Sequence, residues 1–257
     1  MNSPDFNPDK IQGIFFDVYG TLFIYNNMED AWKDWITTYH RLLHAKGLQM
    51  PLETFISKTD GFFSLPEPTD KEKDFSVFQC RVKRYVEELG LELSNEIIKE
   101  ISDKCLNEWQ KYVLLDPEVI PLLAYLKQNK KLALISNFDH PPHLHNLLKA
   151  SKIIEYFDHI TISGEIGIKK PNPEIFSSAL AELNLSPGEV IYIGDSPVDV
   201  KAAQEANMTP IIIMRKNLEH YSLQTDFNKE GISRKISLPK YKDILIINSL
   251  KDLYDLF

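Results

Sequence analysis

The chain has 257 residues, of which 43% are hydrophobic and 26% are charged, a balance that is typical of globular proteins and excludes disordered and fibrous classes. Its formal net charge is -8 at pH 7 and neither end carries a long basic run, so we expect neither nucleic acid nor an anionic membrane as its main partner. It has no visible secretory signal and no apolar stretch of the roughly 20 residues that cross a bilayer, so we expect a cytoplasmic protein.

The first predicted strand, Ile11–Phe16, is followed by a segment too long for a single crossover connection. Within this segment, residues 26–113 carry aromatic and charged side chains at helical spacing. We expect helices over Ala31–Lys46, Asp74–Leu89 and Ser94–Tyr112, with a proline-containing loop at Gly61–Pro68. The pattern therefore predicts a helical insert at 26–113, between two parts of a core formed by residues 1–25 and 114–257.

The rest of the chain alternates between short apolar runs and helical patterns. The later runs predict strands over Leu132–Ile135, Val190–Ile193, Pro210–Met214 and Ile244–Ile247. Helices are expected over Leu122–Asn129, Pro173–Leu183, Val198–Ala206 and Ser249–Leu256. Continuous apolar strands suit a parallel sheet that is covered on both faces. The fold prediction is therefore an α/β protein with a doubly wound parallel sheet.

A polar side chain directly follows the first predicted strand. Asp17 stands at its end, and Gly20 permits a sharp turn shortly after it. In an open parallel sheet the carboxyl ends of the strands line the binding crevice, so Asp17 is a candidate for the floor of a site. A lone aspartate at this position can also simply cap a turn.

Three more polar clusters follow later strands or begin later helices. Ser136 and Asn137 close the second predicted strand, Lys170 precedes a proline-started helix, and Asp195 and Asp199 follow the third strand. Each has an ordinary structural explanation as a turn, a solvated lysine or a helix cap. Their repeated occurrence at strand ends favours one shared site, and the carboxylates are ligands that suit magnesium.

Together these segments resemble the haloacid dehalogenase-like (HAD) hydrolase superfamily. The resemblance rests on D-V-Y-G-T-L from Asp17, S-N from Ser136, K-P-N-P-E-I-F from Lys170 and G-D-S-P-V-D from Gly194. It spans nearly the whole chain and implies a Rossmann-like core with an α-helical cap at the position of the insert. It also implies a hydrolase that acts through a covalent aspartyl intermediate.

The resemblance assigns roles to the residues that match its motifs. Asp17 is implied to attack the substrate, and Lys170 to balance the charge. Thr21, Ser136 and Asn137 are implied to bind the transferred group or to orient the nucleophile. This chemistry is physically reasonable, because a carboxylate nucleophile divides a difficult substitution into two easier steps.

A magnesium site is implied for the metal-dependent members. Asp17, Asp195 and the backbone carbonyl of Tyr19 are the implied ligands, while Asp199 supports them without binding the metal. A lysine and a divalent cation would offset the repulsion between Asp17 and an anionic substrate.

Tyr19 departs from the pattern of most phosphatases in the superfamily. They carry a general acid and base aspartate at this position, and loss of such a group typically costs about 100-fold to 10,000-fold in rate. The 2-haloacid dehalogenases carry a tyrosine there, because a halide leaving group needs no proton. Tyr19 by itself therefore favours dehalogenation.

Two other positions favour a phosphatase. Dehalogenases usually have serine and asparagine where this chain has Asp195, and a tyrosine where it has Phe176. They also need an arginine for the substrate, for which Arg41, Arg81 and Arg84 are candidates. We therefore place a magnesium-dependent phosphatase of small phosphorylated metabolites ahead of a metal-free 2-haloacid dehalogenase-type hydrolase. A non-catalytic binding protein on the same fold is the third alternative, and the oligomeric state stays open.

Cysteine and histidine residues do not form a recognisable metal pattern. Cys80 and Cys105 are too few for a disulfide framework and are expected to be ordinary thiols. His140, His143 and His145 invite a zinc interpretation, but they lack a matching set of cysteines or glutamates. We expect them at the lip of the crevice, with His140 as a candidate replacement proton donor, because imidazole titrates near neutral pH.

Overall fold

A six-stranded sheet has the strand order β5-β4-β1-β6-β7-β8, and each neighbouring pair is parallel. The structure is a computed structural model that describes residues 7–68, 72, 74–215 and 244–257. From edge to edge the strands are His159–Ile162, Lys131–Ser136, Gly13–Phe16, Val190–Gly194, Thr209–Ile213 and Leu245–Ile247. Every residue of β1 and β6 is buried, which explains their continuous apolar sequences. The predicted parallel α/β sheet is confirmed.

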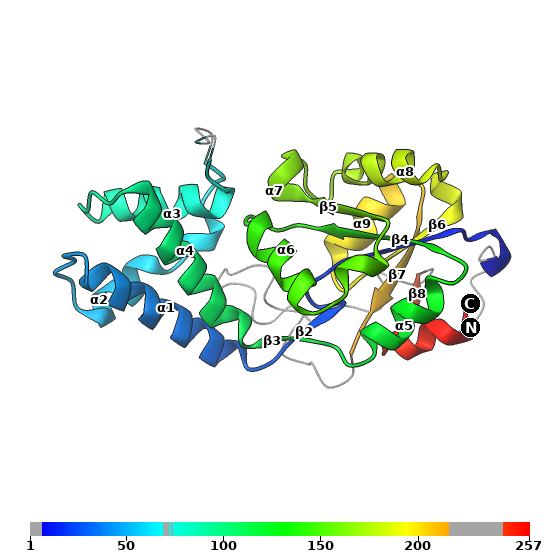
Figure 1. Cartoon of the computed structure of the whole chain (residues 1–257), viewed down its shortest axis with the longest axis horizontal. Helices are drawn as coiled ribbons and strands as arrows, with labels where there is room; N and C mark the ends of the chain where they lie inside the picture. Colours follow the sequence, from blue (N-terminus) through cyan, green and yellow to red (C-terminus); the bar gives the residue numbers. More distant parts are fainter. Residues whose placement is uncertain (1–6, 69–71, 73, 216–243) are drawn as a thin grey trace.

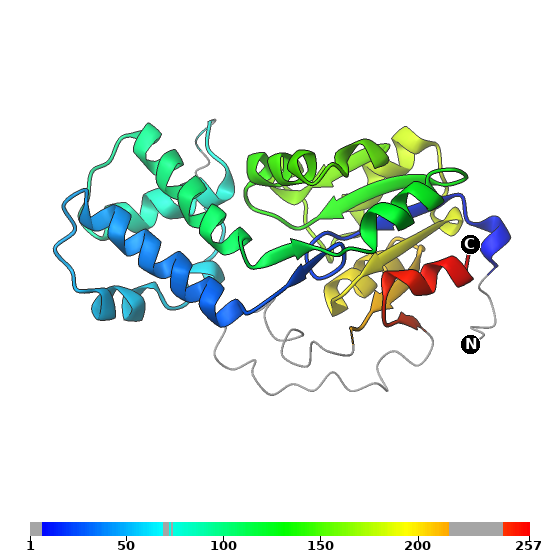
Figure 2. The same cartoon turned by 60° about the horizontal axis from the view of Figure 1, so that its bottom comes forward.

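Helices cover both faces of this sheet (Figures 1 and 2). One hydrophobic cluster joins Ile14 and Phe16 of β1 to α5 (Val119–Leu126), α6 (Pro141–Ala150) and the 3-10 helix η7 (Leu250–Asp255). A second cluster joins Phe15 to α8 (Ser177–Leu183) and α9 (Pro197–Glu205). Successive side chains of a strand point to opposite faces, so β1 contributes to both layers. Shorter helical segments are η1 (Pro8–Lys10), η3 (Ile154–Tyr156), α7 (Ser163–Ile166), η4 (Pro173–Phe176) and η5 (Pro187–Glu189).

The segment between β1 and β4 contains four helices that pack around their own hydrophobic cluster. They are α1 (Met28–His44), α2 (Leu52–Thr59), α3 (Val77–Glu88) and α4 (Asn95–Gln110), with a short 3-10 helix η2 at Phe62–Ser64. The cluster is rich in aromatic rings, including those of Trp35, Tyr39 and Phe55. An antiparallel two-stranded ribbon, β2 (Phe23–Tyr25) with β3 (Val113–Leu115), connects these helices to the sheet region (Figure 1).

Several elements differ from the sequence prediction for identifiable reasons. Strand β5 was not predicted, because its sequence alternates the polar His159 and Thr161 with isoleucines and so forms no continuous apolar run. Helix α6 begins with two prolines, which are tolerated in a first helical turn but suggest a break in the sequence. Helix α5 starts at Val119 rather than Leu122, helix α2 lies in a stretch for which no element was predicted, and the final predicted helix is a 3-10 helix.

Two further expectations concern the membrane and the cysteines. None of the helices in the described ranges is long and apolar enough to span a bilayer. Cys80 and Cys105 are both buried and both free, as the sequence predicted.

The neighbouring residues Phe55 and Ile56 of α2 provide a test of how the four helices pack. Phe55 is fully buried among aromatic rings, whereas Ile56 is 38% exposed. We expect Phe55→Ala to lower the free energy of unfolding by about 3 to 5 kcal/mol, because it removes a large core side chain. Ile56→Ala should cost less than about 1 kcal/mol. Urea unfolding of both variants measures the difference, and equal losses would contradict the described packing.

Candidate active site

The topology places three of the predicted residues at adjacent strand ends. Asp17 directly follows β1, Ser136 is the last residue of β4, and Asp195 directly follows β6. Strands β4 and β6 flank β1 in parallel, so their carboxyl ends meet at one edge of the sheet. Asp17 is 6% exposed, and its backbone N–H donates to the carbonyl of Ile193 at 2.8 Å.

Lys170 brings a buried positive charge to this edge. Its Nζ lies 2.6 Å from Oδ1 of Asp17 and 2.7 Å from Oδ1 of Asp199. The backbone of Lys170 is held by the Asn137 side chain, which donates to its carbonyl at 3.0 Å and accepts from its N–H at 2.9 Å. These two hydrogen bonds tie the Asn137 side chain to the backbone of Lys170.

The charges at this edge are unbalanced. Burial raises the pKa of Asp17 to about 6, an effect that Lys170 opposes and Asp199 reinforces. Burial also raises the pKa of the Asp195 carboxyl, and the Asp17 and Asp199 charges raise it further. For Lys170, burial alone would lower the pKa, but the same two aspartates hold it above its ordinary value. One ammonium group therefore faces three carboxylates.

These carboxylates fit a hard divalent cation. Asp17, Asp195 and Asp199 each offer an oxygen within 4.8 Å of the others, and no other group of this kind occurs in the described part of the chain. Both oxygens of Asp199 already accept hydrogen bonds, Oδ1 from Lys170 and Oδ2 from the N–H and hydroxyl of Ser196. Asp199 is therefore more fully hydrogen-bonded than Asp17, whose Oδ2 has only a long contact from the Thr21 hydroxyl at 3.4 Å.

Two glycines make this close arrangement of carboxylates possible. Gly20 has a φ of +85°, and a Cβ atom built on it would lie 1.9 Å from Oδ2 of Asp195. A Cβ atom on Gly194 would lie 2.4 Å from the Cβ of Asp199. The sequence indicated only that a sharp turn favours glycine at position 20. The structure shows a second reason, because the Asp195 carboxylate occupies the space of a side chain there.

Thr21 and Ser136 lie beside the nucleophile candidate as the sequence predicts. Thr21 is fully buried, and its hydroxyl faces Oδ2 of Asp17 at 3.4 Å. Ser136 is 1% exposed and occupies the end of β4. The structure thus brings both hydroxyl-bearing residues to the edge where Asp17 lies.

The ring of Tyr19 lies between the sheet region and the helical insert. Its centroid is 5.3 Å from that of Trp109 and 5.0 Å from that of Phe138. Its hydroxyl faces Oε1 of Gln110 at 3.4 Å. Burial, reinforced by the charge of Asp17, raises its pKa far above the ordinary value, so the phenol stays protonated at neutral pH. Tyr19 therefore packs in an aromatic cluster with Trp109 and Phe138, and its hydroxyl is directed at the insert.

The three histidines do not converge on a common point. Their nearest polar partners are Ser76 and Asp103 for His140, Gln110 for His143 and Glu165 for His145, at 2.6 to 3.1 Å. Both ring nitrogens of His140 are therefore bonded to the insert, and His140 is 1% exposed. Burial lowers the pKa of His143 to about 4, with His140 adding to the effect. This arrangement supports neither the zinc interpretation nor a role for His140 as proton donor at Asp17.

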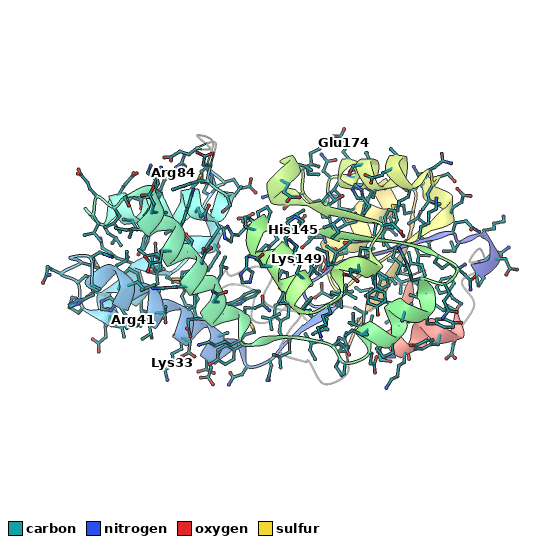
Figure 3. All side chains as sticks on the ribbon, viewed as in Figure 1. Lys33, Arg41, Arg84, His145, Lys149 and Glu174 are labelled. Carbon is teal, nitrogen blue, oxygen red and sulfur yellow. The ribbon has the colours of Figure 1, made fainter. Side chains whose placement is uncertain are left out.

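The candidate substrate arginines lie on the insert. Arg41 and Arg84 lie on α1 and α3, Arg41 near the lower edge and Arg84 near the upper edge of the insert in Figure 3. The buried Arg81 side chain donates to the carbonyls of Leu65 and Pro66 and lies 3.4 Å from a carboxylate oxygen of Asp139. Arg81 therefore has a structural task at the boundary between insert and core.

Two residues at this edge escaped the sequence analysis. The Tyr192 hydroxyl lies 2.8 Å from Nζ of Lys170, although Tyr192 belongs to an apolar strand. Arg215 donates to the carbonyl of Thr21 at 2.8 Å and pairs with Asp116 at 2.5 Å. A tyrosine within a buried strand is a usable signal, because a buried hydroxyl generally needs a polar partner. No comparable signal marks Arg215.

Known proteins resemble this chain in sequence and in fold. A glyceraldehyde 3-phosphate phosphatase from Methanopyrus kandleri is 32% identical over 112 residues, covering 43% of this chain and 48% of that protein. The chain thus spans about half the length of this relative. A HAD phosphatase from Thermococcus onnurineus has a TM-score of 0.62 at 19% identity, covering 96% of this chain and 97% of the other. A 2-haloacid dehalogenase from Pseudomonas syringae has a TM-score of 0.59 at 20% identity, with 96% and 97% coverage.

The two structural neighbours establish the fold and do not separate the two chemistries, since one is a phosphatase and the other a dehalogenase. The sequence model that matches residues 11–207 describes haloacid dehalogenase-like hydrolases. The match includes every position of the edge described above except Arg215. The chain belongs to the haloacid dehalogenase-like hydrolase family.

Proposed function

We propose that this hydrolase is a magnesium-dependent phosphatase of small phosphorylated metabolites, with Asp17 as its covalent nucleophile. The observation that carries the proposal is the cluster in which the Lys170 ammonium and the partly buried Asp195 carboxylate flank the buried Asp17. Magnesium at Asp17, Asp195 and the Tyr19 carbonyl would supply charge neutralisation for an anionic phosphate ester. The phosphatase name of the Methanopyrus kandleri relative also supports this substrate class.

In the proposed reaction a carboxylate oxygen of Asp17 attacks the phosphorus atom. The bond from phosphorus to the ester oxygen breaks, and the departing oxygen takes a proton from water. Water then attacks the phosphorus of the aspartyl phosphate, which releases inorganic phosphate and restores Asp17. Lys170 offsets the negative charge throughout, while Thr21 and Ser136 offer hydroxyl donors to the phosphoryl oxygens.

We also propose that residues 26–113 act as a cap on a core formed by residues 1–25 and 114–257. The separate hydrophobic cluster of the insert supports this division. Contacts of His140 with Ser76 and Asp103 join the proposed cap to the loop after Ser136. Residues 1–6 and 216–243 of the proposed core lie outside the described residues.

A 2-haloacid dehalogenase-type reaction is the second candidate. Tyr19 favours it, because a halide leaves without a proton. Asp195 disfavours it, because burial and neighbouring carboxylates make an ionised Asp195 costly without a cation. The response to magnesium distinguishes the two reactions.

Asp17→Asn tests the nucleophile. An amide cannot form the aspartyl intermediate, so we expect turnover of phosphate esters to fall below detection. The matched control is Asp255→Asn at an exposed position, which should keep wild-type rates. Mass spectrometry of the quenched wild-type reaction should show the added phosphoryl group on Asp17. Full activity in a folded Asp17→Asn protein would reject the assignment.

Magnesium binding is expected to stabilise the fold, because the cation offsets repulsion among buried carboxylates. At a free concentration of about 100 times Kd, a ligand that binds only the folded state adds about 2.7 kcal/mol to the free energy of unfolding. Thermal melts with magnesium and with chelator measure the effect, and Asp195→Asn should remove most of it. If neither the melting temperature nor the reaction rate changes with magnesium, the result would favour the dehalogenase reaction.

Tyr19→Asp tests whether the lack of a general acid at position 19 limits the reaction. Without a proton donor, rates should fall steeply as the leaving group becomes more basic, so aryl phosphates should react faster than alkyl phosphates. We expect Tyr19→Asp to raise alkyl phosphate turnover relative to aryl, by up to the roughly 100-fold to 10,000-fold of general acid catalysis. Tyr19→Phe is the control and should leave the ratio unchanged. An unaltered ratio in Tyr19→Asp would mean that proton donation does not limit this enzyme.

A further inference from the structure

The ammonium group of Lys170 has three N–H donors, and each of them has a close acceptor. The acceptors are Oδ1 of Asp17 at 2.6 Å, Oδ1 of Asp199 at 2.7 Å and the hydroxyl of Tyr192 at 2.8 Å. The carbonyl of Ile135 is more distant, at 3.4 Å. A protonated lysine can donate three hydrogen bonds and accept none, so these three partners satisfy it completely.

Tyr192 is rigidly placed to serve as one of these partners. It lies in β6, is 1% exposed, and its ring packs edge-on against Phe176 at a centroid distance of 4.8 Å. Because its hydroxyl accepts from Lys170, its own proton is directed elsewhere, to the carbonyl of Ile135 at 3.1 Å or to Oδ1 of Asp199 at 3.2 Å. The hydroxyl thus links the ammonium group to one of two acceptors, the residue that precedes Ser136 or Asp199.

The two carboxylates alone do not fix the position of the ammonium group. Lysine is a compact charge on a flexible four-carbon stem, and the attraction of Asp17 or Asp199 acts over a range of positions. A third, neutral contact from a rigid ring restricts the group to one point between them. Without it, one N–H of a buried ammonium group would lose its close partner, which is costly.

We propose that Tyr192 is a positioning residue for the reaction at Asp17, and that its hydroxyl holds the Lys170 ammonium at the point where its charge meets the transferred group. The catalytic consequence rests on the proposed function, whereas the positioning itself does not. Tyr192 acts through Lys170 and is not proposed to contact the substrate.

The kinetic test is Tyr192→Phe, which removes one oxygen atom. We expect kcat to fall about tenfold or more, the effect of one hydrogen bond to a charged group, while KM changes less than about threefold. Tyr85→Phe is the matched control, because Tyr85 is also buried and its hydroxyl bonds Thr59 at 2.8 Å within the insert. Tyr85→Phe should destabilise the fold and leave kcat within about twofold of wild type.

A second readout does not depend on activity. The ammonium group of a fixed, buried lysine gives a resolved proton–nitrogen NMR signal, which Lys170→Met identifies by its loss. In Tyr192→Phe this signal should shift and broaden, whereas in Tyr85→Phe it should stay unchanged. If Tyr192→Phe fails to fold, 4-fluorophenylalanine at position 192 replaces it, because fluorine fills most of the space of the hydroxyl and is a far weaker acceptor for the Lys170 N–H.

The outcomes separate the two proposals. If the wild-type protein hydrolyses neither phosphate esters nor haloacids, the proposed function fails, and the NMR signal still decides whether Tyr192 positions Lys170. An unchanged signal, or a folded active variant at position 192 with wild-type kcat, would overturn the positioning role. A kinetic loss that persists undiminished when Lys170 is also replaced by Met would overturn it as well, because Tyr192 would then act by another route.

Discussion

The site depends on one electrostatic constraint, which is that a single buried ammonium group pairs with two buried carboxylates while a third, Asp195, lies close to both. Uncompensated charge is expensive to bury, so each carboxylate must be paired, hydrogen-bonded or bound to a cation. The Lys170 ammonium pairs with Asp17 and Asp199, and the backbone N–H of Ser196 donates a further hydrogen bond to Asp199. Asp195 is left with a raised pKa, and this remaining imbalance is the physical basis for proposing magnesium.

The boundary between core and insert is built from the same short segments that carry the site. Tyr19 follows the nucleophile candidate by two residues and contacts Trp109 of the insert. Asp139 and His140 follow Ser136 closely and bond residues of α3 and α4. The position of the insert and the arrangement of the site are therefore physically connected over short stretches of chain.

Much of the fold and part of the site were readable in the sequence, for separate reasons. Buried parallel strands leave continuous apolar runs, so β1, β4 and β6 were recognisable, whereas β5 alternates polar and apolar residues and was not. Polar residues at strand ends revealed Asp17 and Asp195. Hydrogen bonds between side chains distant in sequence leave no pattern, which is why the pairing of Asn137 with the Lys170 backbone required three-dimensional structure.

Gly20 shows how two constraints can fall on one position. Its φ of +85° alone would accept asparagine, which tolerates left-handed backbone better than most residues. The carboxylate of Asp195 also occupies the place of a Cβ atom, so any side chain here would have to displace that carboxylate, whatever its backbone preference. Mutational tolerance at position 20 is therefore set by the neighbouring strand rather than by the turn. A homologue with a larger residue here would need a different placement of its second carboxylate, which makes this glycine a marker of the site's architecture.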